Sequence, residues 1–485
     1  MSSTPTVLLT GATGTMGRFA LEELLRAGVH VRALVLPKDR ARPVVEQLQT
    51  LGPLELMAGD LTDYASVRDA VQGCDFVVHI AALVSPAADE NPELADKINV
   101  GSIENLLRAL EDQGQLEHTR VIGIGSVAQT GNRPPPIHWG RVGDPMFPSV
   151  FDRYACSKIR AERLLVDSQV RRWVWLRQTA LAYPELVTRI GSLDPIAFHQ
   201  PLGNCLEWVT ARDSGRLIRQ AVCRELPAEF WNRVYNIGGG DRFRCTALEF
   251  MRGVFEACDL GELSDWFEPH WFATQNFHGH WYLDSDDLEK WLLFRSEGLR
   301  EFLLQVSRQV PKWRRWASQW VPRVVRKRLM AKVAMKPRGT LSWIHGKREP
   351  ELTAFYGSPD GWRYSVSWDD ARFQRSNAEP LRLDHGYDET KSRLDRDDFA
   401  TAAEFRGGVL VSEEVEPGNL RARLKWRCAL GHEFNGSPYL VLKAGHWCPS
   451  CEPPPWNVEE LAARNRFFAQ VAKRRAIDFE SASAS

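Results

Sequence analysis

The segment from Thr6 to Arg26 most constrains what this chain can fold into. It reads TVLLTGATGTMGRFALEELLR: an apolar run, three glycines spaced as GxxGxxG, and a pattern that places leucines on one helical face. This order predicts a strand, a tight turn and a helix. In such a unit Gly11 allows the turn, Gly14 lets backbone N–H groups approach a pyrophosphate, and Gly17 lets the helix pack against the strand. The helix N-terminus then faces the phosphate charge.

Further apolar runs extend this unit into a sheet. Strand-like runs occupy residues 31–36, 54–60, 76–82, 120–126 and 173–179, with helical patterns between them. Alternation of strand and helix is typical of a doubly wound parallel sheet, so we predict an α/β fold of the Rossmann type. The chain has 485 residues, and single cores stop growing near ~250 to 300 residues, so we expect two or more domains.

Charge and composition exclude several classes of protein. The 62 basic and 62 acidic side chains cancel, so no global field favours nucleic acid or an acidic membrane. The sequence lacks a run of ~18 apolar residues and a signal-peptide pattern at its start. Nine cysteines, an odd number, do not suit a secreted disulfide framework. We therefore expect a soluble cytoplasmic protein.

Residues after the second strand bear on the choice of nucleotide. An acid at the end of this strand would hydrogen-bond the ribose of NAD, whereas basic residues accommodate a 2′-phosphate. Here the strand ends in Val35 and Leu36, with Lys38 and Arg40 just beyond, and Arg18 follows the third glycine. This pattern favours NADP(H), with NAD as the alternative.

A tyrosine and a lysine lie four residues apart in the run YACSK, residues 154–158. At this spacing Tyr154 and Lys158 share one face of a helix. A phenol with an ordinary pKa near ~10 is a poor acid–base catalyst at neutral pH. A cation beside it favours the phenolate and lowers the pKa, and Lys158 can supply that charge.

Together these motifs resemble the extended short-chain dehydrogenase/reductase family, which is epimerase/dehydratase-like. The resemblance rests on TGATGTMG, Gly59-Asp60-Leu61, His79-Ile80-Ala81-Ala82, Asn99-Val100-Gly101, Ser126 and YACSK, and covers roughly residues 5–300. It implies that Tyr154 is the general acid or base and that Lys158 tunes it and holds the nicotinamide ribose. Ser126 would hydrogen-bond the substrate oxygen, and Asn99 would order a proton-relay water.

The same resemblance implies a set of cofactor contacts. Asp60 and Leu61 would lie at the adenine, and Ala81 and Ala82 along the cofactor backbone. The complete set of predicted cofactor-binding residues is Gly11, Gly14, Thr15, Met16, Gly17, Arg18, Lys38, Arg40, Asp60, Leu61, Ala81, Ala82 and Lys158.

Two departures from the family pattern bear on the substrate. Dehydratases of the family carry an acidic pair after the active-site hydroxyl residue, whereas Val127 and Ala128 follow Ser126 here. Ala180 occupies the position of an asparagine that is typical of the sugar-nucleotide enzymes. These departures favour a carbonyl reductase or alcohol dehydrogenase that acts on a less polar molecule.

The substrate lobe is expected largely within residues 183–300, and its later part is dense in aromatic side chains. Two interpretations stay open: a pocket for an apolar ring or acyl chain, or packing of this domain against the C-terminal one. The aromatic residues are Trp266, Phe267, Trp271, Phe272, Phe277, Trp281, Tyr282, Trp291 and Phe294.

Residues 301–348 form a basic, aromatic connector. From 303 to 348 there are thirteen Lys and Arg residues and no acid, with Trp313, Trp316 and Trp320 at helical spacing. We interpret the segment as an interdomain connector docked by its tryptophans. Nucleic acid, a membrane surface or an acidic partner are the alternatives for its basic residues.

Residues 349–475 contain a pattern of soft metal ligands. Cys428-x3-His432 and Cys448-x2-Cys451 are separated by fifteen residues, and this pattern resembles a zinc ribbon. Four protein ligands leave no open position, so we predict a structural zinc, with His446 as a competing ligand. Residues 476–485 are expected to be a flexible tail.

These observations predict an NADP(H)-preferring oxidoreductase that acts on a small-molecule substrate. Tyr154 would be its general acid or base. The expected reaction is hydride transfer between nicotinamide and a carbonyl or alcohol carbon of an apolar molecule. One alternative is an NAD-dependent epimerase of a sugar-like substrate. Another is a nucleotide-sensing scaffold that binds protein or nucleic acid through the zinc module. A homodimer is the family's habit and is expected here.

Overall fold

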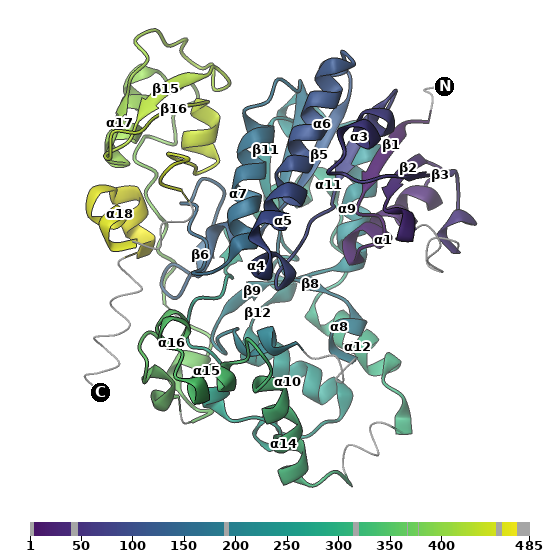
Figure 1. The fold of residues 1–485 in the computed structure, drawn as a ribbon, viewed down its shortest axis with the longest axis vertical. Helices are drawn as coiled ribbons and strands as arrows, with labels where there is room; N and C mark the ends of the chain where they lie inside the picture. Colours follow the sequence, from purple (N-terminus) through teal and green to yellow (C-terminus); the bar gives the residue numbers. More distant parts are fainter. Residues whose placement is uncertain are drawn as a thin grey trace.

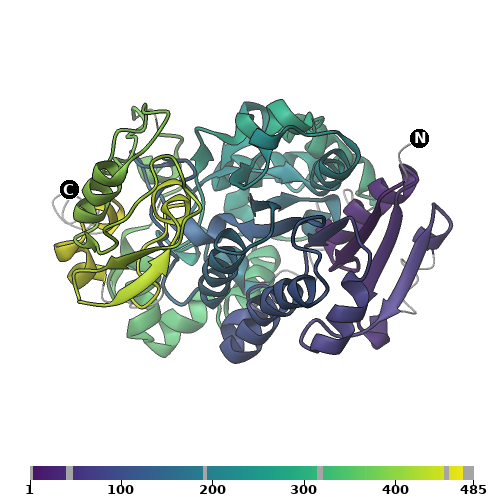
Figure 2. The same ribbon diagram turned by 90° about the horizontal axis from the view of Figure 1, so that it is seen from above.

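Three parts of the chain lie together in the computed structural model: a sheet covered by helices, a second lobe below it, and a C-terminal module beside it (Figure 1). The structure describes residues 4–39, 47–188, 194–313, 320–365, 367–376, 378–452 and 458–472. The expected tail at 476–485 is outside these residues. The C-terminal module and the first strands occupy opposite ends of the molecule, as both views show (Figures 1 and 2).

Seven parallel strands form the main sheet, in the order β11-β7-β5-β4-β1-β2-β3. Strand β1 lies in the interior of the sheet, and its Thr10 pairs with Leu34 of β2 on one side and His79 of β4 on the other. The predicted Rossmann fold is thus confirmed. The strands are β1 (Thr6–Thr10), β2 (His30–Val35), β3 (Leu54–Ala58), β4 (Phe76–His79), β5 (Arg120–Ser126), β7 (Arg172–Gln178) and β11 (Arg233–Ile237).

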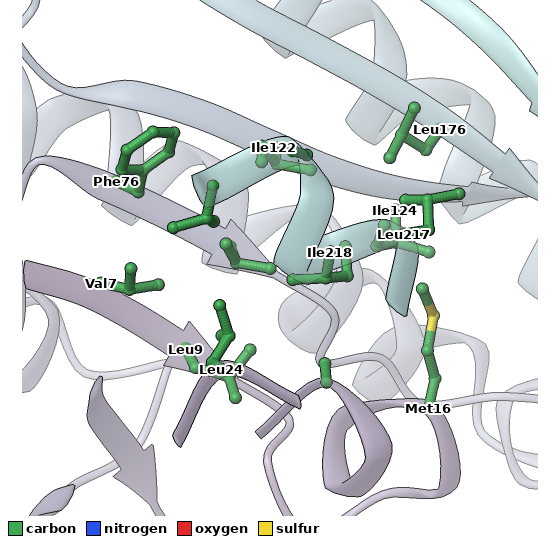
Figure 3. Packing of buried hydrophobic residues seen from close by; sticks show 14 of the residues in the cluster. Val7, Leu9, Met16, Leu24, Phe76, Ile122, Ile124, Leu176, Leu217 and Ile218 are labelled. Atoms are coloured by element: carbon green, nitrogen blue, oxygen red, sulfur yellow. The ribbon is translucent and has the colours of Figure 1, made fainter. Parts of the chain in front are cut away.

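Helices cover both faces of the sheet, which explains why its strands are rich in Val, Ile and Leu throughout. Figure 3 shows one face, where Met16 and Leu24 of the first helix and Leu217 and Ile218 of α9 pack on strand residues such as Ile122. The other face packs against α3, α6 and α7. The covering helices are α1 (Thr15–Arg26), α9 (Ala211–Cys223) and α11 (Ser285–Leu292) on the first face, with α3 (Tyr64–Val71), α6 (Gly101–Asp112) and α7 (Arg153–Val166) on the second.

The glycine turn after β1 is fixed by close backbone contacts. Gly11 has a φ of +74°, and a Cβ there would lie 2.6 Å from the backbone nitrogen of Ala81. A Cβ on Gly17 would lie 1.9 Å from the Gly11 carbonyl oxygen. These contacts bring the start of α1 against the turn, as the spacing of the glycines predicts.

The second lobe packs its aromatic residues internally. Trp266, Phe267 and Trp271 form one cluster with Met330 and Leu341 from the segment beyond residue 300. The lobe is built from β8 (Leu181–Ala182), α8 (Pro184–Thr188), β9 (Cys205–Glu207), β10 (Val209–Thr210), β12 (Arg244–Thr246), α10 (Ala247–Cys258), α12 (Leu299–Gln309), α14 (Arg323–Ala334), α15 (Thr340–Gly346) and α16 (Glu349–Tyr356) (Figure 1).

The basic segment docks on this lobe through charges and through α14 and α15. Arg323 pairs with Asp265 at 3.3 Å, and Lys327 pairs with Glu268. The expectation that its tryptophans dock it is wrong for Trp313 and Trp320, whose side chains are 65% and 71% exposed. Trp316 lies outside the described residues. None of the helices in the described part of the chain combines the length and apolar character needed to cross a bilayer.

The C-terminal module contains a small antiparallel sheet in the order β14-β15-β16. It lies beside the β11 end of the main sheet (Figures 1 and 2). Its elements are α17 (Arg396–Phe405), β14 (Val409–Leu410), β15 (Leu424–Arg427), β16 (Glu433–Gly436), a π-helical turn (Tyr439–Lys443) and α18 (Val458–Arg464).

The module shares a core with the main sheet. Leu440 and Ala444 are buried in the same cluster as Trp173 of β7, and the Tyr439 hydroxyl accepts a hydrogen bond from the Val234 backbone N–H at 2.8 Å. Burial of this apolar area means that the module and the sheet stabilise each other.

Gly17→Ala should lower the free energy of unfolding by about 1–3 kcal/mol, the usual cost of overpacking. Gly14→Ala is the matched control, because its Cβ would lie 3.4 Å from the Gly11 oxygen, an ordinary contact distance. Urea unfolding followed by circular dichroism measures both. Equal stability of the two variants would contradict the close approach of α1 to the turn.

Candidate functional site

A cleft of about 750 Å³ opens at the carboxyl ends of the strands, next to the point where the strand order reverses between β1 and β4. Ligands of doubly wound sheets bind at this place, and the volume suits a small-molecule ligand. The cleft brings together these predicted residues: Gly11, Gly14, Thr15, Met16, Gly17, Asp60, Leu61, Ala81, Ala82, Ser126, Tyr154 and Lys158.

One end of the cleft is formed by the first turn of α1. Its N-cap is Gly14, and no side chain caps this helix among the described residues. The Gly14 N–H itself donates to the Gly11 carbonyl at 3.0 Å. The N–H groups of the next residues, at the positive end of the helix dipole, suit the negative charge of a pyrophosphate.

The end of β2 differs from what the sequence indicated. Lys38 is exposed and, like Arg18, does not line the cleft, while Arg40 lies outside the described residues. Asp39 does line it and is only 9% exposed. A short 3-10 turn places it there, since the Asp39 N–H donates to the Leu36 carbonyl at 2.8 Å.

Sequence reasoning missed Asp39 because it looked for an acid only at the strand's last two residues. The signal was nevertheless present. The run Leu36-Pro37-Lys38-Asp39 places proline at the first position of a turn, and such a turn brings the residue three positions beyond Leu36 back toward the sheet.

Tyr154 and Lys158 lie on α7, whose start is capped by Asp152 accepting from the Ala155 N–H at 2.8 Å. The Tyr154 hydroxyl is hydrogen-bonded to the side chain of Ser126. Burial raises the pKa of Tyr154 above its ordinary value, and the Ser126 hydrogen bond only partly opposes this. The phenol is therefore protonated at neutral pH, and the predicted lowering of its pKa by Lys158 is absent from this structure.

Lys158 is buried beneath the cleft. Its ammonium donates to the Ile124 carbonyl at 2.8 Å, and burial lowers its pKa to about 7. The neighbouring His79 is held neutral, because burial and then Lys158 lower its pKa to about 3. Lys158 therefore changes charge near neutral pH, where an anion bound in the cleft would favour the ammonium.

Ser126 sits at the end of β5 in a capping box that the sequence encodes as Ser-x-x-Gln. Its hydroxyl accepts from the Ala128 N–H at 3.2 Å, and its own N–H donates to Gln129 Oε1 at 2.8 Å. This arrangement fixes the serine backbone and leaves its hydroxyl directed at Tyr154. Gln129 is a second residue that the sequence analysis passed over.

Asn99 does not line the cleft. It is fully buried on α5 (Pro92–Asn99). Its amide nitrogen donates to the Leu83 carbonyl at 2.9 Å and to the Ser157 hydroxyl at 2.8 Å, and its oxygen accepts from the Leu83 N–H at 2.7 Å. Asn99 thus connects the loop after β4 to α7. Its proposed role in a proton relay stays a prediction.

The aromatic residues of 266–294 do not line the cleft, so the interpretation of these rings as a substrate pocket is wrong. Most of them pack inside the second lobe or on the main core, because their large apolar area is buried there. The apolar wall of the cleft comes instead from Leu83, Val84, Leu94, Leu181 and Tyr183.

A second candidate site lies in the C-terminal module. The ligand atoms of Cys428, His432, Cys448 and Cys451 all lie within 4.8 Å of one another. Cys428 Sγ is 3.4 Å from His432 Nδ1 and 3.7 Å from Cys451 Sγ. Tetrahedral zinc with bonds of about 2.1–2.3 Å separates its ligand atoms by roughly 3.5–3.8 Å, so the four residues fit the metal.

The competing ligand, His446, is not part of this cluster. Its Nε2 lies 3.0 Å from Glu162 Oε1 on α7. Two basic residues that precede Cys428 also have partners: Arg421 donates to the Val170 carbonyl at 2.9 Å, and Lys425 pairs with Glu433 at 2.6 Å.

Two curated proteins are similar to part of this chain. Cinnamoyl-CoA reductase 1 of Oryza sativa subsp. japonica is 30% identical over 171 residues, which is 34% of this chain and 49% of that protein. The 3 beta-hydroxysteroid dehydrogenase type 7 of Rattus norvegicus is 29% identical over 169 residues, with the same coverage of 34% and 49%. The chain thus spans about half the length of these curated relatives.

A solved structure shares the fold. The dTDP-glucose 4,6-dehydratase from Bacillus anthracis str. Ames in complex with NAD superposes with a TM-score of 0.50 at 16% identity. The match covers 64% of this chain and 98% of that one. Residues 7–238 also match the model of the NAD dependent epimerase/dehydratase family. Over these residues the chain is therefore similar to the NAD dependent epimerase/dehydratase family.

Proposed function

We propose that this protein is a nicotinamide-nucleotide-dependent oxidoreductase that interconverts a carbonyl and an alcohol on an apolar small molecule. The observation that carries the proposal is the hydrogen-bonded pair of Ser126 and Tyr154, with Lys158, in the same cleft as the glycine turn. A site of this kind offers a nucleotide-binding end and a proton donor at the reacting end.

The bound nicotinamide would supply or accept the hydride. Tyr154 donates its proton to the carbonyl oxygen in the reductive direction, and its raised pKa keeps that proton in place until the oxygen gains charge. Ser126 donates a hydrogen bond to the same oxygen. The first turn of α1 would hold the pyrophosphate, and Lys158 would hold the nicotinamide ribose.

An apolar substrate is supported by the wall of the cleft. Val84 and Leu94 line it while 53% and 40% exposed, and Leu83, Leu181 and Tyr183 continue the surface. Arg177 is fully buried in an ion pair with Glu162, so the arginine at the end of β7 does not face a substrate phosphate. The relatives named as a reductase and a hydroxysteroid dehydrogenase agree with this assignment.

For the nucleotide we propose NAD(H) in place of the NADP(H) that the sequence favoured. The carboxylate of Asp39 lines the cleft after β2, where it would accept hydrogen bonds from a ribose and repel a 2′-phosphate. Lys38, the residue before Asp39, is exposed and does not line the cleft.

For the Cys428, His432, Cys448 and Cys451 cluster we infer a structural zinc. Three of the four residues are buried, and all four ligand positions of a tetrahedral ion would be filled by the protein. The ion would then stabilise a module that has only a small core of its own.

Tyr154→Phe should lower turnover of ketone or aldehyde substrates by at least about 100-fold, because it removes the proton donor. Its affinity for NADH, measured by fluorescence titration, should stay within about twofold. Tyr64→Phe makes the same chemical change on α3, away from the cleft, and should keep full turnover. Near-normal turnover by the Tyr154 variant would refute the assignment.

Asp39→Ala should weaken NADH binding by about tenfold and strengthen NADPH binding, because it removes the ribose acceptor and a charge that repels phosphate. Lys38→Ala, on the neighbouring exposed residue, should change neither affinity. Titration of protein that mass spectrometry shows to be free of nucleotide measures both. Tighter binding of NADPH than of NADH by the unaltered protein would restore the original prediction, and tightly retained NAD would favour an epimerase.

The stability of the nucleotide-free protein should depend on pH through Lys158. Its pKa is about 7 in the folded protein and near ~10.4 in an unfolded chain. Between these values the unfolded chain binds more protons, so this contribution to the free energy of unfolding rises with pH from 7 toward 10 and is lost as the pH falls through 7. Lys158→Met removes it.

The measurement is the difference in melting temperature between the unaltered protein and Lys158→Met at pH 6.5, 8 and 9.5. The melting temperature of the unaltered protein should rise relative to that of the variant as the pH increases. A difference that stays constant over this range would show that burial leaves the pKa of Lys158 at its ordinary value.

A further inference from the structure

Buried polar contacts connect the metal-binding module to the catalytic helix. His446 lies two residues before the ligand Cys448 and is fully buried. Its Nε2 is 3.0 Å from Oε1 of Glu162. Glu162 is fully buried on α7, one helical turn beyond Lys158. The loop that carries the second pair of metal ligands is therefore in direct contact with the helix that carries Tyr154 and Lys158.

Glu162 is connected to Ser126 through Gln129. Its Oε2 accepts from Gln129 Nε2 at 2.6 Å, and Gln129 Oε1 accepts from the Ser126 N–H at 2.8 Å. Arg177 of β7 also donates to Glu162, through Nε at 3.0 Å. A continuous path thus runs from His446 through Glu162 and Gln129 to the backbone of the active-site serine.

A second set of contacts holds the same loop. Glu452, the residue after the ligand Cys451, accepts from Arg163 of α7 at 2.8 Å. It also lies 3.4 Å from His446 Nδ1 and accepts from the Trp447 N–H. Arg163 donates in turn to the Trp447 carbonyl. Two adjacent residues of α7, Glu162 and Arg163, therefore both bind the loop formed by residues 446–452.

Strand β5, which ends at Ser126, leaves space for this path at Gly125. A Cβ on Gly125 would lie 2.4 Å from Gln129 Oε1 and 2.2 Å from Trp175 Nε1. The glycine leaves room for Gln129 to turn back beneath the serine and reach Glu162. Arg177 extends the link, since it also donates to the Ala444 carbonyl of the module at 2.8 Å.

We propose that metal binding by Cys428, His432, Cys448 and Cys451 positions the active site, with Glu162 as the positioning residue that acts through Gln129 on Ser126. Two of the four ligands lie in the loop that His446 and Glu452 hold against α7. Loss of the ion frees this loop, and Glu162 then loses its contact with His446, one of its three partners. A buried carboxylate needs all of its partners to stay in place. This proposal rests on the proposed oxidoreductase function for its catalytic consequence.

Asp167 provides a matched control, because it docks the same module without reaching the active site. It lies at the end of α7 and accepts from the Ser437 N–H at 3.1 Å and from its hydroxyl at 2.6 Å. Its hydrogen bonds within the described residues do not include Gln129 or Ser126. If Glu162 only docked the module, substitutions at Glu162 and Asp167→Asn would have the same effect on the active site.

The first experiment compares hydrogen–deuterium exchange of the full chain carrying zinc with that of the chain after chelation. Removal of zinc should speed exchange at residues 126–131 and 155–163 as well as within the module, while β2 and β3 stay unchanged. A change confined to the module would overturn the proposal, as would a purified chain that neither contains nor takes up zinc. This readout does not depend on turnover.

The second experiment uses Glu162→Gln and His446→Gln in the zinc-loaded chain. Glu162→Gln leaves the buried Arg177 without its counter-charge and risks misfolding, whereas His446→Gln keeps that ion pair. Both should retain one zinc per chain and NADH affinity within about twofold, yet speed exchange at 126–131 and lower kcat by about 10- to 100-fold. Asp167→Asn should loosen only residues 434–440.

The outcomes separate this proposal from the function itself. An unaltered protein without turnover or nucleotide binding would refute the oxidoreductase assignment, while the exchange data would still decide the coupling. His446→Gln that matches Asp167→Asn in exchange at 126–131 and in kcat would refute the coupling and leave the assignment standing.

Discussion

The buried carboxylate of Glu162 is the constraint on which much of this structure depends. A charge in a protein interior is tolerated only when charged and hydrogen-bonding partners surround it. Here the partners come from three distant parts of the chain: Gln129 after β5, Arg177 on β7, and His446 in the C-terminal module. Arg177 and His446 lower the pKa of Glu162 to about 2 against the effect of burial. The sheet, helix α7 and the module must therefore assemble together.

The sequence predicted the parts of the fold that depend on local pattern. Strands rich in Val, Ile and Leu, the glycine turn at 11–17 and the pair Tyr154 and Lys158 each follow from periodicity or from a fixed spacing, and each lies where the pattern placed it. The knuckles at 428–432 and 448–451 are equally local, and their ligand atoms converge. In these places a few neighbouring residues contain all the information that the structure uses.

What the sequence did not predict depends on contacts between distant residues. Glu162 looks like an ordinary helix residue until Arg177 and His446 are placed beside it, 15 and 284 residues away. The aromatic residues around 271 could serve a pocket or a core, and only the packing of Met330 and Leu341 against them decides for the core. Likewise, Lys38 and Asp39 are neighbours in one turn, and the sequence does not say which of the two side chains faces the cleft. The structure shows that it is Asp39.

Burial also sets the charges of Tyr154 and Lys158. It disfavours the phenolate of Tyr154 and the ammonium of Lys158 alike, so the tyrosine is neutral and the lysine titrates near pH 7. In the proposed function, the negative charge of a bound pyrophosphate would favour the ammonium of Lys158, and that positive charge would favour proton release by the phenol. Nucleotide binding and acid–base chemistry would then be linked through electrostatics.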